Sequence, residues 1–258
     1  AVVPAEGPDW ASDPCEMAER DGHIYGRGAC DMKGFIAAVL CMAPRFAQRN
    51  LSRPLHIALT YDEETGCFGA RALAEELRKD GIRPAAAIIG EPTSMRIVEG
   101  HKGCFEYTTE FTGLNGHGSS PDKGVNAVGY AARYATRLME LSEELKTRSP
   151  GNSRFEPPWT TVNLGRIAGG DAHNVIAGHC RLDWEMRPIQ TSDAGMVCEA
   201  IDAYAKTVLE PAMHAVSPDT GIIRHVIGEI AGLEPADDNE ALRIVAALTG
   251  AQGAELVP

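Results

Sequence analysis

The first hundred residues alternate between two hydrophobic patterns, one typical of helices and one of strands. Apolar side chains recur at helical spacing through residues 32–48, where Asp31 suits the N-cap, and again through residues 69–81. The runs 55–61 and 85–90 are short, apolar and partly β-branched, which is typical of buried strands. Strands that alternate with helices in this way predict a parallel α/β sheet with right-handed crossovers.

The pattern changes after residue 102. Expected strands and helices then follow the order β-α-β-β-α-β, at residues 104–113, 126–146, 160–170, 180–188, 195–213 and 222–232. This order is the ferredoxin-like arrangement. A final helix is expected at residues 238–250. We therefore expect a small α+β domain over residues 103–232, inserted into a larger α/β domain formed by residues 1–102 and 233–258.

Composition narrows the function classes. The chain has 258 residues, a net charge of −12 and 44% hydrophobic residues, which suits a globular protein with a sizeable core. The acidic balance argues against a nucleic-acid partner, since phosphate binding needs clustered Lys and Arg. No window holds the ~18 apolar residues that a membrane crossing needs. The seven cysteines are scattered without a CxxC pair, so reduced thiols and a cytoplasmic location are expected.

Four carboxylates stand where a parallel sheet would gather them. Asp31 lies at a helix start, Glu63 and Glu64 follow the run 55–61, and Glu91 follows the next apolar run. The carboxyl ends of parallel strands are where ligands bind, and clustered carboxylates repel one another unless a cation offsets them. This favours a metal site. From spacing alone, however, the alternatives stay open that Asp31 is a helix cap, that Glu63 and Glu64 form a solvated turn and that Glu91 is a surface residue.

Four motifs carry a resemblance to a known family. They are, in chain order, GRGACDMKG, YDEETGCFGA, IIGEPTSM and NGHGSSPDKGVNA. Together they resemble the M20 family of zinc aminoacyl hydrolases and peptidases, over essentially the whole chain. The resemblance implies a parallel-sheet catalytic domain and assigns the inserted ferredoxin-like domain to a lid that also forms a homodimer. The phrase IIGEPTSM followed by GHKG is most similar to the acetylornithine deacetylase branch of this family.

The resemblance also implies a role for each carboxylate. Asp31 would bridge two Zn²⁺ ions, for which Co²⁺ is a possible substitute. Glu64 would bind one ion and Glu91 the other. Glu63 would remain free as the general base. This division is chemically reasonable, because zinc lowers the pKa of its bound water toward ~7 and a neighbouring carboxylate can then move the proton.

Three residues of the expected inserted domain match further family positions. His117, in NGHGSS, would reach the active site of the partner subunit and stabilise the developing oxyanion. Asn174 and Arg187 would bind the carboxylate of the substrate, for which the bidentate guanidinium of arginine is suited. Without the resemblance, a histidine beside glycines is usually a loop residue, and an arginine at a strand end is usually a surface residue.

The chain departs from the family pattern near both ends. The family has a His-x-Asp motif just before a segment similar to residues 2–4, and Ala1 stands where that aspartate is expected. The last histidine ligand of the family lies well beyond a helix such as 238–250. We therefore expect a fragment that lacks two metal-binding histidines, binds metal weakly and is inactive, from an active full-length enzyme. If Ala1 is a genuine substitution, a catalytically inactive dimeric relative that only binds ligands is the alternative.

The expected reaction of the full-length protein is metal-dependent hydrolysis of the N-acyl amide of a small N-acyl amino acid. N-acetylornithine, hydrolysed to ornithine and acetate in arginine biosynthesis, is the expected substrate. Succinyl-diaminopimelate desuccinylase and a broad aminoacylase or carboxypeptidase are the alternatives within the enzyme class.

Overall fold

The chain forms two compact units. The computed structural model describes residues 5, 9–64 and 66–257. The first unit contains the described residues up to Ile97 together with Asp237–Ala254, and the second contains Val98–Ala236 together with the described residues from Glu255 onward. The segment Val98–Ala236 of the second unit is thus flanked in sequence by both parts of the first. Its role as a lid or dimerisation domain stays a prediction.

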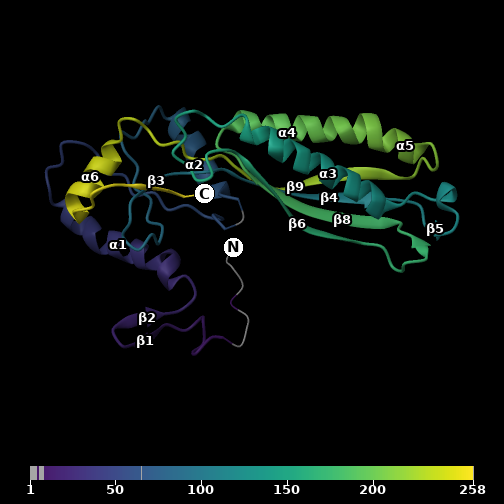
Figure 1. Ribbon diagram of the computed structural model, residues 1–258. Coiled ribbons are helices and arrows are strands. Elements are labelled where there is room, and N and C mark those ends of the chain that lie inside the picture. Colours follow the sequence, from purple (N-terminus) through teal and green to yellow (C-terminus); the bar gives the residue numbers. More distant parts are fainter. Residues whose placement is uncertain (1–4, 6–8, 65, 258) are drawn as a thin grey trace. The chain divides into compact units, whose positions relative to one another are not determined.

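A four-stranded antiparallel sheet forms the base of the second unit, with helices on one face (Figure 1). The strands lie in the order β6 (Thr161–Gly169), β8 (His179–Arg187), β4 (Cys104–Thr112) and β9 (Gly221–Ile230). The helical segments are α3 (Ala127–Lys146), α4 (Thr191–Tyr204), η3 (Ala205–Leu209) and α5 (Glu210–His214). The predicted order β-α-β-β-α-β is confirmed for this unit, and the first strand, β4, pairs with both β8 and β9.

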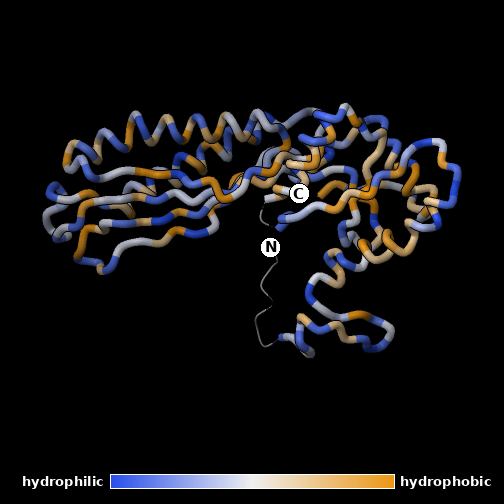
Figure 2. Tube along the Cα trace, turned by 180° about the vertical axis from the view of Figure 1, so that it is seen from behind, coloured by the Kyte–Doolittle hydropathy of each residue, from blue (hydrophilic) through white to orange (hydrophobic). Residues whose placement is uncertain are grey.

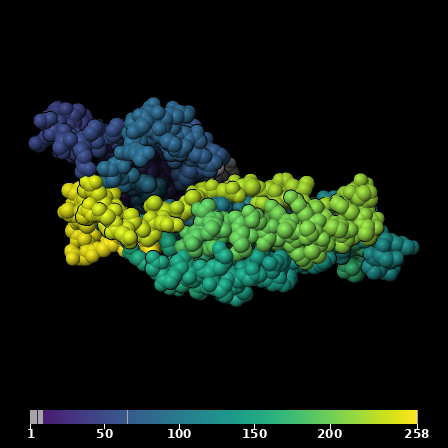
Figure 3. All heavy atoms as spheres, turned by 90° about the horizontal axis from the view of Figure 1, so that it is seen from above, coloured from purple at the N-terminus to yellow at the C-terminus, as the bar shows by residue number. Residues whose placement is uncertain are grey.

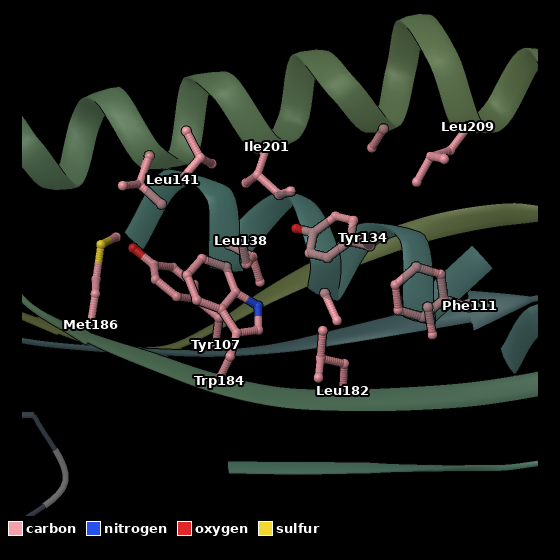
Figure 4. Packing of buried hydrophobic residues seen from close by; sticks show 14 of the residues in the cluster. Tyr107, Phe111, Tyr134, Leu138, Leu141, Leu182, Trp184, Met186, Ile201 and Leu209 are labelled. Atoms are coloured by element: carbon pink, nitrogen blue, oxygen red, sulfur yellow. The ribbon is translucent and has the colours of Figure 1, made fainter. Parts of the chain in front are cut away.

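The core of the second unit lies between this sheet and its helices. Alternate residues of β4 are buried on the helix side, among them Tyr107, Thr109 and Phe111. Tyr107 stacks on Trp184 of β8 at 4.5 Å between ring centroids, and the indole N–H of Trp184 donates to Thr109 Oγ1 at 3.0 Å. Figure 4 shows both rings beneath Leu138 of α3. Period-two burial and aromatic stacking therefore fix the face that the sheet buries.

Helix α3 shows why this sequence forms a helix here. The Asn126 side chain accepts a hydrogen bond from Gly129 N at 3.0 Å, which caps the first turn. The buried residues of α3 recur at intervals of three and four, at Ala127, Ala131, Tyr134, Ala135, Leu138, Leu141 and Leu145. Its opposite face is polar and joins α4 and α5 in the surface seen in Figure 3. None of the helices in the described ranges is long and apolar enough to cross a membrane.

Short elements complete the second unit. Strand β3 (Val98–His101) pairs in parallel with β10 (Glu255–Val257), and β5 (Gly116–His117) pairs antiparallel with β7 (Val175–Ile176). A 3₁₀ turn, η2 (Pro121–Lys123), follows β5. The two short pairs form separate two-stranded sheets, which join segments that connect the longer elements.

The first unit is less densely packed. It contains the hairpin β1 (Ala18–Arg20) and β2 (His23–Tyr25), the π-helical turn η1 (Ala29–Lys33), and the helices α1 (Gly34–Ala47), α2 (Phe68–Lys79) and α6 (Glu240–Thr249). Of its helical residues, only Gly69 in α2 is buried. Figure 2 shows hydrophobic stretches, in orange, along both units, so the difference lies in packing and not in apolar content.

The two strands predicted in the first unit were wrong. Residues 55–61 and 85–90 form no strand, and most of their apolar side chains are exposed, including Leu59 at 63% and Ile89 at 71%. Apolar, β-branched content favours a strand only where a neighbouring strand supplies hydrogen bonds and where other elements bury its side chains. Among the described residues, these segments have no such neighbour.

Candidate active site

Asp31 lies where the chain leaves a helical path. Gly28 adopts a left-handed conformation (φ 74°), and the amide of Lys33 donates to its carbonyl at 2.9 Å, which forms the turn η1. Asp31 itself is non-helical (φ −115°, ψ 96°), and the peptide to Met32 is cis. The expected N-cap role of Asp31 is wrong, because α1 begins three residues later with Lys33 as its N-cap. Its carboxylate is exposed and is available to a ligand.

Glu63 and Glu64 lie in a turn that folds back onto the preceding segment. The amides of Gly66 and Cys67 both donate to the carbonyl of Glu63, at 3.1 Å each. The Gly69 amide donates to the carbonyl of Tyr61 at 3.0 Å. A Cβ at Gly69 would lie 2.4 Å from the Tyr61 nitrogen, so this close approach requires glycine. The turn holds both glutamates, exposed, just before α2.

Glu91 lies in a second turn. Its carbonyl accepts from the Thr93 amide at 2.8 Å, and the Thr93 hydroxyl donates to the carbonyl of Arg96 at 2.6 Å. The side chain of Glu91 is exposed. Local hydrogen bonds, rather than a sheet, therefore position this carboxylate.

The four carboxylates share one electrostatic neighbourhood. Although they are exposed, neighbouring protein atoms partly shield Glu63 from water and raise its pKa, and the negative charges of Glu64 and Asp31 raise it further. The same shielding raises the pKa of Glu91, with contributions from Asp31, Glu63 and Glu64. The charges of all four predicted residues thus interact within the first unit. Mutual repulsion of this kind favours a bound cation.

The residues present fit a divalent cation by their chemistry. Carboxylate oxygens are accepted by Zn²⁺ and by other divalent ions, and the charge of the cluster needs compensation. Within the described ranges, however, no three side chains of this cluster bring ligand atoms within 4.8 Å of one another. The prediction for Ala1 lies outside the described residues.

His117 and Asn174 are brought together in the second unit. Strands β5 and β7 pair at His117 and Val175, and the Gly118 amide donates to the carbonyl of Asn174 at 2.7 Å. The Ser119 amide donates to His117 Nδ1 at 3.3 Å. Since Nδ1 accepts this hydrogen bond, the proton of the neutral ring is assigned to Nε2, which leaves an N–H donor on an exposed side chain.

Arg187 lies elsewhere in the same unit. It ends β8, a nine-residue strand whose first residue lies near Gly113 and Gly178, so roughly 26 Å of strand separates it from the region of His117. Its guanidinium forms an ion pair with Glu185 at 2.8 Å. A single chain therefore does not bring Arg187 to His117.

One cluster was not predicted from the sequence. Cys104, Glu106 and Glu185 place ligand atoms within 4.8 Å of one another, on the sheet face opposite the helices and beside Arg187. Burial raises the pKa of the Cys104 thiol, and the neighbouring Arg187 lowers it. Period-two alternation predicts that Cys104 and Glu106 share a face, but the register that adds Glu185 is visible only in the folded sheet.

Comparison with known sequences identifies the family. The sequence pattern of Peptidase family M20/M25/M40 matches residues 2–241. The chain belongs to this family. It is 36% identical over 249 residues to an acetylornithine deacetylase of Proteus mirabilis (strain HI4320), and 34% identical over 251 residues to one of Pasteurella multocida (strain Pm70). These alignments cover 96% and 97% of this chain but 62% and 63% of the relatives, so the chain spans less than two thirds of their length.

Solved structures agree on the fold of this M20 chain. A tripeptidase from Staphylococcus aureus subsp. aureus Mu50 aligns with a TM-score of 0.62 at 21% identity, covering 94% of this chain and 62% of the other. The aminopeptidase PepT of Bacillus cereus ATCC 10987 aligns with a TM-score of 0.61 at 19% identity, covering 94% and 61%. At these identities the likeness establishes the mixed α/β fold and not the substrate.

Proposed function

We propose that the protein containing this chain is a metal-dependent amidohydrolase that removes the acetyl group of N-acetylornithine, giving ornithine and acetate for arginine biosynthesis. The observation that supports this proposal is the electrostatic coupling of Asp31, Glu63, Glu64 and Glu91, since the charges of the other carboxylates help to raise the pKa values of Glu63 and Glu91. The names of the two bacterial relatives support this substrate. The cytoplasm is the proposed location.

Asp31, Glu64 and Glu91 are the proposed ligands of two Zn²⁺ ions, with Co²⁺ as a possible substitute. When bound, the ions would supply an activated water and polarise the acyl oxygen. Glu63 is the proposed general base, which takes a proton from the attacking water and returns it to the leaving nitrogen.

The second unit would supply the remaining contacts in a homodimer. The exposed Nε2–H of His117 is the proposed donor to the developing oxyanion in the partner subunit. Asn174 and Arg187 are proposed to bind the carboxylate of the substrate. The separation of Arg187 from His117 within one chain supports an arrangement in which a site uses residues of two subunits.

The decisive test of the site is Glu63→Gln in the complete protein. The variant keeps shape but cannot accept the proton, so kcat should fall by about 10²–10⁴-fold. Metal content, measured on the same sample, should be unchanged. Glu76→Gln on α2, whose carboxylate pairs with Lys79 at the surface, is the matched control and should keep full activity. Loss of metal from Glu63→Gln would mean that Glu63 is a ligand, and an unchanged kcat would refute its role as the base.

The substrate is tested by comparing N-acetylornithine with N-succinyl-diaminopimelate and a panel of N-acyl amino acids. A higher kcat/KM for the succinylated substrate would refute the deacetylase proposal, and similar values across the panel would indicate a broad aminoacylase or carboxypeptidase. No turnover by the complete, metal-loaded protein would favour the inactive binding relative.

A further inference from the structure

Two arginine–carboxylate pairs follow one another along β8, on the face of the sheet opposite the helices. Arg181 donates from Nε to Asp183 Oδ1 at 2.8 Å, and Arg187 donates from Nε to Glu185 Oε2 at 3.0 Å. Each pair spans two residues of one strand, so its side chains share a face. Only Arg187 is assigned to the substrate in the proposed function, so the first pair serves as an internal comparison for the second.

The Glu185 carboxylate holds one edge of the Arg187 guanidinium. Its Oε2 accepts from Nε at 3.0 Å and forms an ion pair with Nη2 at 2.8 Å, so one oxygen bridges both nitrogens. A guanidinium carries five N–H donors, and these contacts leave the N–H groups along the Nη1–Nη2 edge. That edge is a fork that a carboxylate can accept in a bidentate manner. The Arg187 side chain is 38% exposed, so the protein does not enclose the guanidinium.

Two side chains of β4 adjoin this pair. Cys104, Glu106 and Glu185 place their thiol and carboxylate atoms within 4.8 Å of one another, and the Cys104 thiol accepts a hydrogen bond from Arg187. A thiol is a weak acceptor, so a substrate carboxylate can displace it. Glu106 lies directly opposite Glu185 in the register. Like charges in these positions repel each other, and the guanidinium offsets that repulsion.

An arginine that is already held loses less freedom when a ligand binds. Arginine is among the side chains that lose the most rotamer freedom when they are fixed. The contacts with Glu185 fix the guanidinium before the substrate arrives, so substrate binding carries less of this entropic cost. Without Glu185, the guanidinium could turn toward Glu106 on the neighbouring strand. A fork that is mobile or turned away binds a carboxylate more weakly.

We propose that Glu185 is a positioning residue, which holds Arg187 so that the Nη1–Nη2 edge of its guanidinium receives the carboxylate of the N-acyl amino acid. The inference rests on the proposed function, which assigns Arg187 to that carboxylate. It adds the residue that orients the guanidinium and the edge that binds the substrate.

Steady-state kinetics of Glu185→Gln in the complete protein test the inference. The KM for N-acetylornithine should rise by about threefold to tenfold, as expected when a hydrogen-bonded anchor is lost, and kcat should stay within about twofold. The thermal unfolding midpoint should change little, because partly exposed ion pairs add little stability. Asp183→Asn is the matched control and should leave both kinetic constants unchanged, since Asp183 pairs with an arginine on the same strand face and is 28% exposed against 27% for Glu185.

A double variant separates positioning from a general effect of charge. Arg187→Ala alone should raise KM by a larger factor than Glu185→Gln. Addition of Glu185→Gln to Arg187→Ala should raise KM no further, because a residue that acts only through Arg187 has no effect once that side chain is gone.

Three results would overturn the inference. An unchanged KM in folded Glu185→Gln would leave Glu185 a mere surface partner of Arg187. A lower KM would make it a competitor of the substrate. Additive effects in the double variant would show that it does not act through Arg187. If Glu185→Gln does not fold, Glu185→Asp takes its place, because it is one methylene shorter and loses reach, and the same three results apply.

Failure of the proposed function gives a different result. If the unchanged, metal-loaded protein turns over none of the N-acyl amino acids in the panel, the proposed function is refuted and this inference with it. If it prefers another member of the panel, the same variants are compared on that substrate, which also carries a carboxylate. Normal turnover with an unchanged KM in Glu185→Gln refutes the positioning role alone.

Discussion

The two units differ in packing and in proposed chemistry: the second holds the buried core and the first holds the proposed catalytic carboxylates. The second unit buries Tyr107, Leu138 and Trp184 in one continuous core, whereas the first unit exposes Leu59 and Ile89 although its apolar content is comparable. The four proposed catalytic and metal-binding carboxylates all lie in the first unit. Apolar sequence is thus necessary for a core but not sufficient, since burial requires a partner surface.

The first unit relies on local and electrostatic contacts instead. Arg53 forms an ion pair with Glu240 at the start of α6, and Arg27 lies over the ring of Trp10 at 5.4 Å. Exposed contacts of this kind are individually weak. The structure therefore predicts that equal substitutions have unequal effects in the two units.

The largest contrast is expected for leucine truncation. Leu138→Ala removes a side chain that is fully buried in the second unit and should lower the free energy of unfolding by about 2–5 kcal/mol. Leu59→Ala removes one that is 63% exposed in the first unit and should change it by less than about 0.5 kcal/mol. Urea denaturation followed by circular dichroism measures both. Equal losses would show that the first unit buries Leu59 in solution.

Helix caps should show a smaller contrast. Asn126 caps α3 and Asn239 caps α6, each by accepting an amide hydrogen bond at 3.0 Å. Replacement of either by Ala should cost about 1 kcal/mol. In the second unit the loss should appear as lower global stability, because α3 packs on the core. In the first it should appear as local fraying of α6, which buries no residue. Exchange rates of the first-turn amides distinguish the two, and identical behaviour would contradict the comparison.

The smallest effect is expected from pH, because exposed carboxylates are screened by water and salt. The pKa values of Glu63 and Glu91 are raised in the folded chain, so folding binds protons there more tightly than the unfolded chain does. Their contribution is complete below the unfolded value of about 4.3 and is lost as pH rises through the raised value.

Glu91→Gln should therefore flatten the decrease in stability of the first unit as pH rises from about 4, and excess Zn²⁺ should oppose that decrease in the unchanged chain. Thermal unfolding at a series of pH values measures both effects. Glu143→Gln on α3 is the control, since its carboxylate pairs with Lys146 in the other unit. A steeper decrease in Glu91→Gln would reverse the sign derived from the structure.

Sequence reasoning succeeded where a pattern is local. The helices and the β-α-β-β-α-β order of the second unit were predicted because amphipathic spacing and period-two alternation leave little choice there. The strand predictions for residues 55–61 and 85–90 were wrong because an apolar run alone does not show whether a neighbouring strand is present to pair with it. Asp31 failed as a cap for another reason, since Gly28 diverts the backbone into a π-helical turn that helical periodicity cannot reveal.

In the candidate site, too, local features could be predicted and features that depend on distant parts of the chain could not. The roles that the four motifs predict for the carboxylates stay predictions, and the structure adds that the charges of the four interact. The Cys104 cluster was missed because it depends on which residue of β8 lies opposite Glu106, a register that separate strands do not encode locally. The ion pair of Arg187 with Glu185 could have been anticipated from their spacing of two on one strand face.

The position of β4 has a consequence for synthesis on the ribosome. It is the first strand of the four-stranded sheet to be made, yet it lies in the middle of that sheet, where Phe105 pairs with Met186 on one side and Glu229 on the other. Its two hydrogen-bonding edges stay unpaired until their partner residues are synthesised. These partners follow Phe105 by about eighty residues in β8 and by more than a hundred in β9. Long-range pairing of this kind slows folding and leaves apolar strands exposed meanwhile. The nascent chain is therefore expected to depend on chaperones until β9 has left the exit tunnel.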